Sequence, residues 1–335
     1  FKQKTAYEML RSLVGSEMCI RDRSRTKQTA KFLLTSALLL ALLPALVQAG
    51  PRGVYVTPLP GKEGGLSGET KVYDRSYAVV IGINDYALLP KLTGAVRDAR
   101  TVKAALEDQG FEVKELTDRA ATRQAIAHLL GDALRNRVGK DDRVLVFFAG
   151  HGVSTGTGET AMGYLMPVDG DRGSPASTGI SMTELQNWFA DYRAKHVMFV
   201  ADACYSGLAL STRATGLSPD TQEYLRKITS KPVRVALVAG GAGEEASELR
   251  GQGLFTGFFL EAIGGAADAD KNGVITSDEI AAYVKPNVSQ TAMSQFRAQQ
   301  NPQMGRRGEG EFVFINPMGA KLTLGALKVS SSEQG

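Results

Sequence analysis

Continuous apolar runs recur along the middle of the chain. They lie at residues 77–83, 144–148, 197–201 and 233–239. Runs without polar alternation are typical of strands that are buried on both faces of a parallel sheet. Residues 111–116 alternate between apolar and polar side chains, which favours an edge strand, and residues 311–315 resemble a last strand.

Helical patterns separate these runs. They cover residues 94–109, 121–138, 183–194 and 256–264. Strands that alternate with helices over about 240 residues predict a single α/β domain with helices on both faces of its sheet. Ligands bind such sheets outside the carboxyl ends of the strands, so the residues that follow each apolar run are the candidates for chemistry.

The beginning of the chain has a different texture. Residues 32–47 form one apolar run, which follows basic side chains and ends near small residues. We predict a signal peptide at residues 24–49, cleaved after Ala49, and therefore an exported protein, periplasmic or secreted. An uncleaved anchor is the alternative, although the run is shorter than the ~20 residues of a spanning helix. Residues 1–23 resemble translated sequencing adapter, and we interpret them as an artefact.

The net charge of the chain argues against one class of function. The 335 residues have a formal net charge of +4, but outside the first 49 residues 31 basic and 32 acidic side chains remain. This balance gives no support to nucleic-acid binding. Proline and glycine are frequent in residues 50–75, which we interpret as a linker before a folded domain at 76–316. Residues 317–335 are left as a C-terminal tail.

Two apolar runs are followed by residues with nucleophilic chemistry. His151 stands between two glycines after one run, and Cys204, the one cysteine of the predicted mature chain, follows another. A thiol needs a nearby base or positive charge to act as a thiolate at neutral pH, and histidine titrates there. A buried, inert cysteine is the alternative. We interpret His128 and His196 as surface or packing residues.

These residues resemble the caspase and metacaspase family of cysteine peptidases. The resemblance rests on His151-Gly152, Asp202–Gly207, Ala78–Tyr86, Gly94–Ala99, Tyr164–Asp169 and Gln300–Gln303, which follow the order of the family's bacterial members. It implies an α/β three-layer sandwich with a mostly parallel six-stranded sheet and helices on both faces. It also implies hydrolysis of peptide or protein substrates by a thiol.

The resemblance implies a role for each site residue. His151 and Cys204 form the catalytic dyad, and the backbone amides of Gly152 and Cys204 bind the oxyanion. Asp202 implies a pocket for an Arg or Lys side chain before the scissile bond, since a carboxylate pairs well with such a cation. A structural aspartate that accepts from local backbone N–H groups is the alternative.

Two positions qualify this specificity. Ala149 stands where metacaspases often have a serine that contributes to the pocket. Asp85 is a candidate for a second acidic wall. The basic segment 207–231 suggests a linker at which such an enzyme processes itself.

Residues 268–279 match the calcium loop of an EF-hand, with the turn glycine at position 6. The predicted ligands are Asp268, Asp270, Asn272, the Val274 carbonyl, Thr276 and Glu279. A single hand lacks its usual partner, so we predict weak, structural Ca²⁺ binding. An Asx-rich turn without useful affinity is the alternative.

No organic cofactor is predicted. Residues 241–246 imitate a dinucleotide fingerprint, but Glu244 and Glu245 stand where the pyrophosphate would bind. The predicted partners are peptide or protein substrates, without nucleic acid and without a membrane beyond the signal segment. The rival function is a catalytically idle caspase-like domain that acts as a calcium-dependent interaction module. Retention of both His151 and Cys204 argues against it.

Overall fold

The computed structural model describes residues 53–58, 70–156, 160–204, 221–241, 244, 246–249, 251–318 and 320–324. All of them belong to one compact unit, residues 49–335. The predicted adapter and signal segments lie outside the described residues, as does most of the predicted processing segment. No helix in the described part of the chain has the length and apolar character needed to cross a membrane.

A six-stranded sheet forms the centre of this unit, in the order β14-β10-β9-β5-β3-β4. Its strands are β3 (Ser76–Gly82), β4 (Glu112–Thr117), β5 (Arg143–Ala149), β9 (His196–Cys204), β10 (Val233–Gly240) and β14 (Gln303–Gly308). Every pairing is parallel except that of β14 with β10. The predicted α/β fold with a mostly parallel sheet is therefore confirmed, and β4 is the predicted edge strand.

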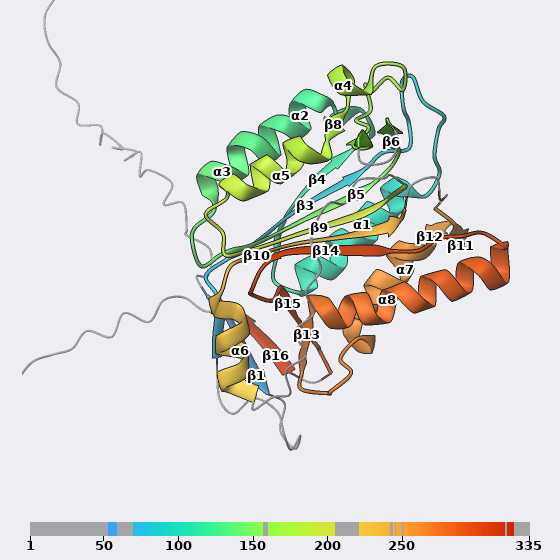
Figure 1. The fold of residues 1–335 in the computed structure, drawn as a ribbon. Helices are drawn as coiled ribbons and strands as arrows, with labels where there is room; N and C mark the ends of the chain where they lie inside the picture. Colours follow the sequence, from blue (N-terminus) through green and yellow to red (C-terminus); the bar gives the residue numbers. More distant parts are fainter. Residues whose placement is uncertain are drawn as a thin grey trace, which may run out of the picture. The chain divides into compact units, whose positions relative to one another are not determined.

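Helices cover both faces of the sheet (Figure 1). One face packs against α2 (Arg123–Ala127), the π-helical turn His128–Ala133, α3 (Leu134–Arg137) and α5 (Met182–Asp191). The other face packs against α1 (Ala95–Asp108), α7 (Leu254–Glu261), its π-helical extension Ala262–Ala266, and α8 (Ser277–Thr291).

The alternation of side chains along the buried strands produces these two cores. In β5, Val146 and Phe148 face the α2–α5 layer, whereas Leu145 and Phe147 face the α1–α8 layer. Successive side chains of a strand point to opposite faces, so a strand covered on both sides must be apolar at every position. This is why the continuous apolar runs predicted the strands well.

Short elements complete the unit. They are β6 (Gly152–Thr155), β7 (Met162–Leu165), β8 (Ile180–Ser181), α4 (Pro175–Thr178), α6 (Thr221–Ser230), β11 (Glu248–Leu249), β12 (Gln252–Gly253), the 3₁₀ turn Asp118–Ala120 and the π-helical turn Ala292–Phe296. β6, β7 and β8 form a small antiparallel sheet beside the carboxyl edge of β5.

The predicted last strand has a different place. Residues 313–315 form β15 (Val313–Ile315), which pairs with β13 (Val274–Thr276) and not with the main sheet. The sixth strand of the main sheet is β14, which the apolar pattern did not reveal. β14 contains two arginines and two glycines, and Arg306 is buried only because Glu311 and Asp278 neutralise it.

The structure also places strands in the segment that we interpreted as a linker. β1 (Val54–Pro58) pairs with β2 (Thr70–Tyr73) and with β16 (Ala320–Leu324), which comes from the predicted tail. Strands of four or five residues are too short for a clear pattern. Val54, Val72 and Tyr73 are nevertheless buried against the domain.

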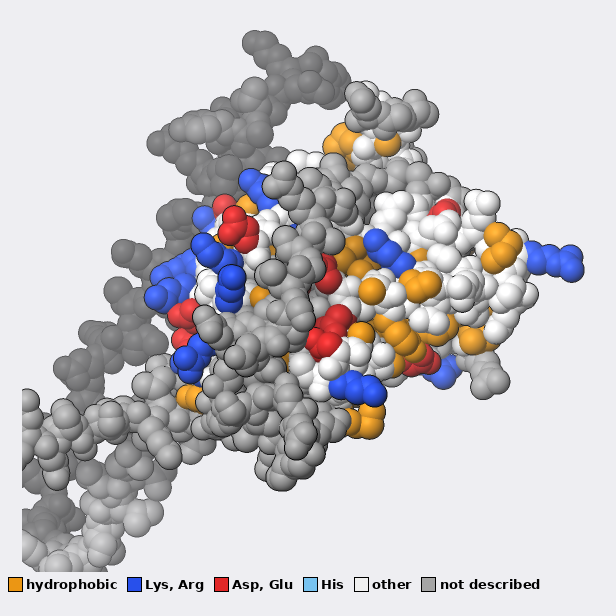
Figure 2. All heavy atoms as spheres, turned by 60° about the horizontal axis from the view of Figure 1, so that its bottom comes forward, with side chains coloured by type: hydrophobic (Ala, Val, Ile, Leu, Met, Phe, Trp, Pro, Cys, Tyr) orange, Lys and Arg blue, Asp and Glu red, His pale blue; other side chains and the backbone are white. Residues whose placement is uncertain are grey.

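Charges of both signs share the surface. Figure 2 shows basic and acidic side chains interspersed over the described part of one face, with apolar side chains between them. Side chains of opposite charge are also paired on the surface, as Arg100 and Lys103 are with Glu115.

Candidate active site

His151 and Cys204 follow neighbouring strands at the same register. β5 and β9 are parallel, and Ala149 pairs with Asp202. Each of the two residues lies two positions beyond this pair, and the Gly150 N–H donates to the Asp202 carbonyl over 3.3 Å. Because paired strands lie about 4.8 Å apart, the backbones of His151 and Cys204 come together at the carboxyl edge of the sheet. The Cys204 side chain lies outside the described atoms.

The His151 ring is held from two sides. Its Nε2 lies 2.8 Å from the Pro90 carbonyl oxygen. A carbonyl only accepts hydrogen bonds, so Nε2 carries the hydrogen and Nδ1 keeps a free lone pair. The ring also packs on Tyr86, with 4.8 Å between centroids, and the His151 N–H donates to the Tyr86 hydroxyl over 2.8 Å. In the neutral ring, Nδ1 is therefore the nitrogen that can accept a proton.

Gly150 is required by packing. A Cβ at this position would overlap the Tyr86 hydroxyl and approach Phe148 Cζ to 3.0 Å. That hydroxyl donates to the Met166 carbonyl over 3.1 Å, so displacing it would break this hydrogen bond. The glycine before the histidine thus allows the contact that orients the imidazole.

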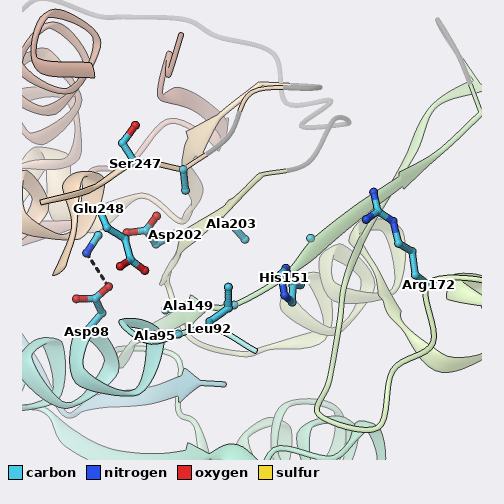
Figure 3. A pocket seen from close by; sticks show the side chains of 14 residues that line it. Leu92, Ala95, Asp98, Ala149, His151, Arg172, Asp202, Ala203, Ser247 and Glu248 are labelled. Atoms are coloured by element: carbon cyan, nitrogen blue, oxygen red, sulfur yellow. Dashed lines mark hydrogen bonds between the residues drawn. The ribbon is translucent and has the colours of Figure 1, made fainter. Parts of the chain in front are cut away.

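A cavity of 380 Å³ opens beside His151 (Figure 3). Leu92, Ala95, Ala149 and Ala203 contribute apolar walls. The carboxylates of Asp98, Asp202 and Glu248 approach one end, and His151 lies toward the other. The cavity therefore joins a candidate base to a strongly acidic end, which we call the acidic pocket and define by Asp98, Asp202, Glu248 and Gly253.

The two buried carboxylates of the acidic pocket are only partly satisfied. Asp202 Oδ2 accepts from the Thr256 hydroxyl over 2.6 Å and from the Thr256 N–H over 3.2 Å. Asp98 Oδ2 accepts from the Gly253 N–H over 3.0 Å, the bond drawn in Figure 3. Asp98 Oδ1 is buried and has no partner among the described residues. A buried, ionised carboxylate oxygen without a donor is costly.

Burial also shifts the protonation of these groups. It raises the pKa of Asp98 to about 7, and the negative charge of Asp202 adds to this shift. Burial raises the pKa of Asp202 to about 6, with the charge of Glu248 acting in the same direction. A cation between the carboxylates would oppose both shifts, because an opposite charge favours the ionised form.

Gly253 makes room for this arrangement. A Cβ at Gly253 would overlap Asp202 Oδ2 and come within 2.9 Å of Asp98 Oδ2. Its φ of −56° and ψ of 128° are accessible to any residue. The glycine is therefore required because there is no room for a Cβ, and not because of its backbone conformation.

Asp202 lies where both alternatives predicted for it remain open, and its role stays a prediction. It lines the cavity, and its Oδ2 also accepts from a backbone N–H at the start of α7. Asp85 does not line this cavity, and its exposed carboxylate pairs with Lys91 over 2.9 Å, so the structure gives no support to its predicted role as a second acidic wall. Asp118 fixes this loop by accepting from the N–H groups of Asn84 and Asp85.

Asp98 lines the cavity, although it is not among the site residues predicted from the sequence. It lies on α1 and is 3% exposed, on the same stripe as buried Ala95, Ala99 and Val102. The sequence does contain a signal for it: an acidic residue on the apolar stripe of an amphipathic helix needs a partner or a ligand. The motif Gly94–Ala99 that supports the family resemblance includes it.

The loop after β10 forms another wall of the cavity. Ser247 donates its N–H to Gln300 Oε1 over 3.0 Å, and Asn301 donates its N–H to Glu244 Oε2 over 2.7 Å. Glu244 also accepts from the Gly241 N–H over 2.9 Å. This glutamate therefore occupies the backbone donor of Gly241.

The loop at 268–279 gathers three carboxylates. Oxygens of Asp268, Asp270 and Glu279 all lie within 4.8 Å of one another. Gly273 has a φ of +85°, as the sharp turn requires. Glu279 closes the loop by accepting from the Thr276 N–H over 2.9 Å. Burial raises the pKa values of Asp270 and Glu279, so protons compete with any cation there.

The strand of this loop has a partner inside the domain. β13 pairs with β15, and Arg143 at the start of β5 donates to the Val313 carbonyl of β15 over 2.5 Å. The side-chain amide of Gln109 forms two hydrogen bonds with the Ile315 backbone. It donates to the carbonyl over 2.7 Å and accepts from the N–H over 3.0 Å. The loop is therefore attached to the domain core and does not stand alone.

The fold and this edge of the sheet define an α/β protein with a histidine and a cysteine on neighbouring strand ends. The family model of the caspase domain, peptidase C14, matches residues 75–311, well over half of the chain. The chain belongs to this caspase-domain family. Membership indicates a caspase-type cysteine peptidase with protein substrates.

The other comparisons add little. The crystal structure of protein GSU0716 from Geobacter sulfurreducens is similar at 19% identity and a TM-score of 0.48, covering 70% of this chain and 94% of that one. A comparison with curated proteins gave no significant match.

Proposed function

We propose that this protein is an exported cysteine endopeptidase that cleaves after arginine or lysine. The observation that carries the specificity is the unpartnered Oδ1 of buried Asp98, beside Asp202, in a cavity shared with His151. A guanidinium or ammonium group supplies the donors and the positive charge that these carboxylates lack. The export follows from the predicted signal peptide alone.

The proposed reaction uses the free Nδ1 of His151. His151 takes the proton of the Cys204 thiol, and the thiolate attacks the carbonyl carbon of the scissile bond. The backbone N–H groups of Gly152 and Cys204 bind the oxyanion that forms. The protonated imidazole gives its proton to the leaving amine as the C–N bond breaks, which leaves a thioester on Cys204. His151 then removes a proton from water, and hydroxide attack releases the acid and restores the thiol.

The acidic pocket binds the cation in a largely apolar surrounding. Because burial raises the pKa of both Asp98 and Asp202 in the free protein, a bound cation lets both ionise and releases protons. Glu248 lies at the exposed rim and adds negative charge at the entrance.

We also propose that the loop at 268–279 binds Ca²⁺. Carboxylate and carbonyl oxygens are the ligands that this cation prefers, and Asp268, Asp270 and Glu279 already lie close together. β15 takes the position that a second hand usually occupies beside β13. Bound Ca²⁺ would neutralise these three carboxylates and stabilise the start of α8.

The deciding experiment is cleavage of fluorogenic peptides that end in Arg, Lys or Asp. The purified protein is compared with its Cys204→Ala and His151→Ala variants, each with Ca²⁺ and with chelator. Cleavage after Arg or Lys that both variants abolish supports the proposal. Folded protein with an intact thiol that cleaves none of the peptides favours the idle interaction module.

A further inference from the structure

The cavity has a cation at the end opposite its carboxylates. Arg172 lines the same cavity as Asp98 and Asp202, and in Figure 3 it lies on the far side of His151 from them. The proposed reaction does not use this side chain. The cavity is thus electrically polar along its length, with acid at one end, a base in the middle and a guanidinium at the other end.

The segment that carries Arg172 is a structured turn. Asp171 Oδ1 accepts from the Gly173 N–H over 2.8 Å, and the Thr178 hydroxyl bonds with both the N–H and the carbonyl of Asp171. Helix α4 follows at once. The backbone of Arg172 is therefore held in place beside the cavity.

The guanidinium itself is available. Arg172 is exposed, and it forms no ion pair or hydrogen bond with any residue that the structure describes. The nearest acidic residue in sequence, Asp171, uses one of its carboxylate oxygens on the Gly173 N–H. An exposed arginine that faces a cleft offers a planar, bidentate site for a carboxylate.

The proposed mechanism decides which part of the substrate meets this arginine. The side chain before the scissile bond lies in the acidic pocket, and His151 must reach the nitrogen of the leaving amine. The chain that leaves therefore continues past His151, away from the acidic pocket and toward Arg172. We propose that Arg172 selects substrates with acidic residues shortly after the scissile bond. This inference rests on the proposed function.

The same charge also orients the substrate. A basic side chain placed near Arg172 would be repelled, so a peptide of the type basic–scissile bond–acidic fits the cavity in one direction only. The effect must be modest because the arginine is exposed. A single exposed ion pair changes a rate or binding constant by about two- to fivefold, and salt weakens it.

The test uses internally quenched peptides with Arg before the cleaved bond. The second and third residues after the bond are Asp-Glu, Ala-Ala or Lys-Lys, and the measured quantity is the ratio of kcat/KM values between peptides. The unmodified protein should prefer Asp-Glu over Lys-Lys by about tenfold at low salt, since two charges reverse. Arg172→Ala should reduce this ratio to near one, and Arg172→Glu should invert it.

Arg193→Ala is the matched control, because Arg193 is also exposed but precedes the amino end of β9. It should leave the ratio unchanged. An unaltered ratio in Arg172→Ala would overturn the inference, while cleavage after Arg would still support the proposed function.

A binding measurement separates the two ideas further. In a Cys204→Ala background, the affinities of the uncleaved Asp-Glu and Lys-Lys peptides are compared with and without Arg172→Ala. Discrimination that depends on Arg172 supports the inference even if the unmodified protein cleaves nothing. Equal affinities in both backgrounds contradict it.

Discussion

A hydrogen bond joins Asp98 to Gly253 in the acidic pocket. The Gly253 N–H donates to Asp98 Oδ2 over 3.0 Å, and a Cβ on Gly253 would approach that same oxygen to 2.9 Å while overlapping Asp202. Only a residue without a side chain leaves both carboxylates this close to the same backbone position. The relationship ties α1, β9 and the start of α7 to a single pocket.

Gly253→Ala should therefore strongly reduce cleavage after Arg while the protein stays folded. The added methyl group occupies the space between the carboxylates, and its backbone angles suit alanine. We expect kcat/KM for Arg peptides to fall on the order of 100-fold, the loss of a well-paired charged contact. Gly257→Ala is the control, since its Cβ meets only Gln252 Oε1 at 3.9 Å. Normal cleavage by Gly253→Ala would show that the cation binds elsewhere.

Removing one carboxylate should distinguish Asp98 from Asp85. Asp98→Ala should reduce kcat/KM for Arg peptides by about 30-fold or more, because it leaves the substrate cation with one buried partner fewer. Asp85→Ala removes an exposed ion pair with Lys91 and should change kcat/KM less than twofold. Steady-state kinetics of both variants check this. An equal effect of the two substitutions would contradict the assignment of the pocket.

Substrate binding should strengthen as the pH rises. Burial raises the pKa of Asp98 to about 7 and that of Asp202 to about 6, so both are largely protonated at pH 5 and ionised at pH 8. A cation binds the ionised pair, so KM for Arg peptides should fall as the pH rises through 6 to 7. Asp98→Asn should remove the upper part of this dependence. A KM independent of pH between 5 and 8 would count against the pocket.

The same shifts should act on stability with the opposite sign. Folded carboxyls with raised pKa values bind protons that the unfolded chain has lost above about pH 4. The contribution of Asp98 and Asp202 to the free energy of unfolding should therefore decrease as the pH rises from about 4 to about 7. Denaturant unfolding at several pH values should show a shallower decrease in Asp98→Asn. An unchanged slope would mean that Asp98 titrates near its ordinary pKa.

Calcium should raise the thermal stability through the loop at 268–279. At about 100 times its Kd, a ligand adds about 2.7 kcal/mol to the folded state, which raises Tm by about 5–10 °C in a domain of this size. Glu279→Gln should remove most of this rise, whereas Glu107→Gln, an exposed acidic residue on α1, should keep it. Differential scanning fluorimetry with Ca²⁺ and with chelator measures both. A rise of equal size in both variants would place the cation elsewhere.

Local patterns were sufficient to predict the four strands of the central sheet that are buried on both faces. A strand covered on both faces must be apolar at every position, so β3, β5, β9 and β10 are visible as continuous runs. β14 escaped detection because its stability depends on pairing with β10 and on the partners of buried Arg306. Neither is encoded in the pattern of β14 itself.

For the candidate site, the sequence determined which reactive side chains are present, and the tertiary structure decided which of them line the same cavity. His151 follows the end of β5, and Asp202 and Cys204 lie at the end of β9, so the parallel strands bring these positions to one edge of the sheet. Asp98 reaches the same cavity from a helix, and Arg172 reaches it from a turn. Gly253 contributes because it has no side chain to fill the space between the carboxylates. Asp85 is nearer to a strand end than Asp98, yet its loop directs it to Lys91. Such placements depend on how helices and loops pack over the sheet, which distant contacts govern and local sequence periodicity does not record.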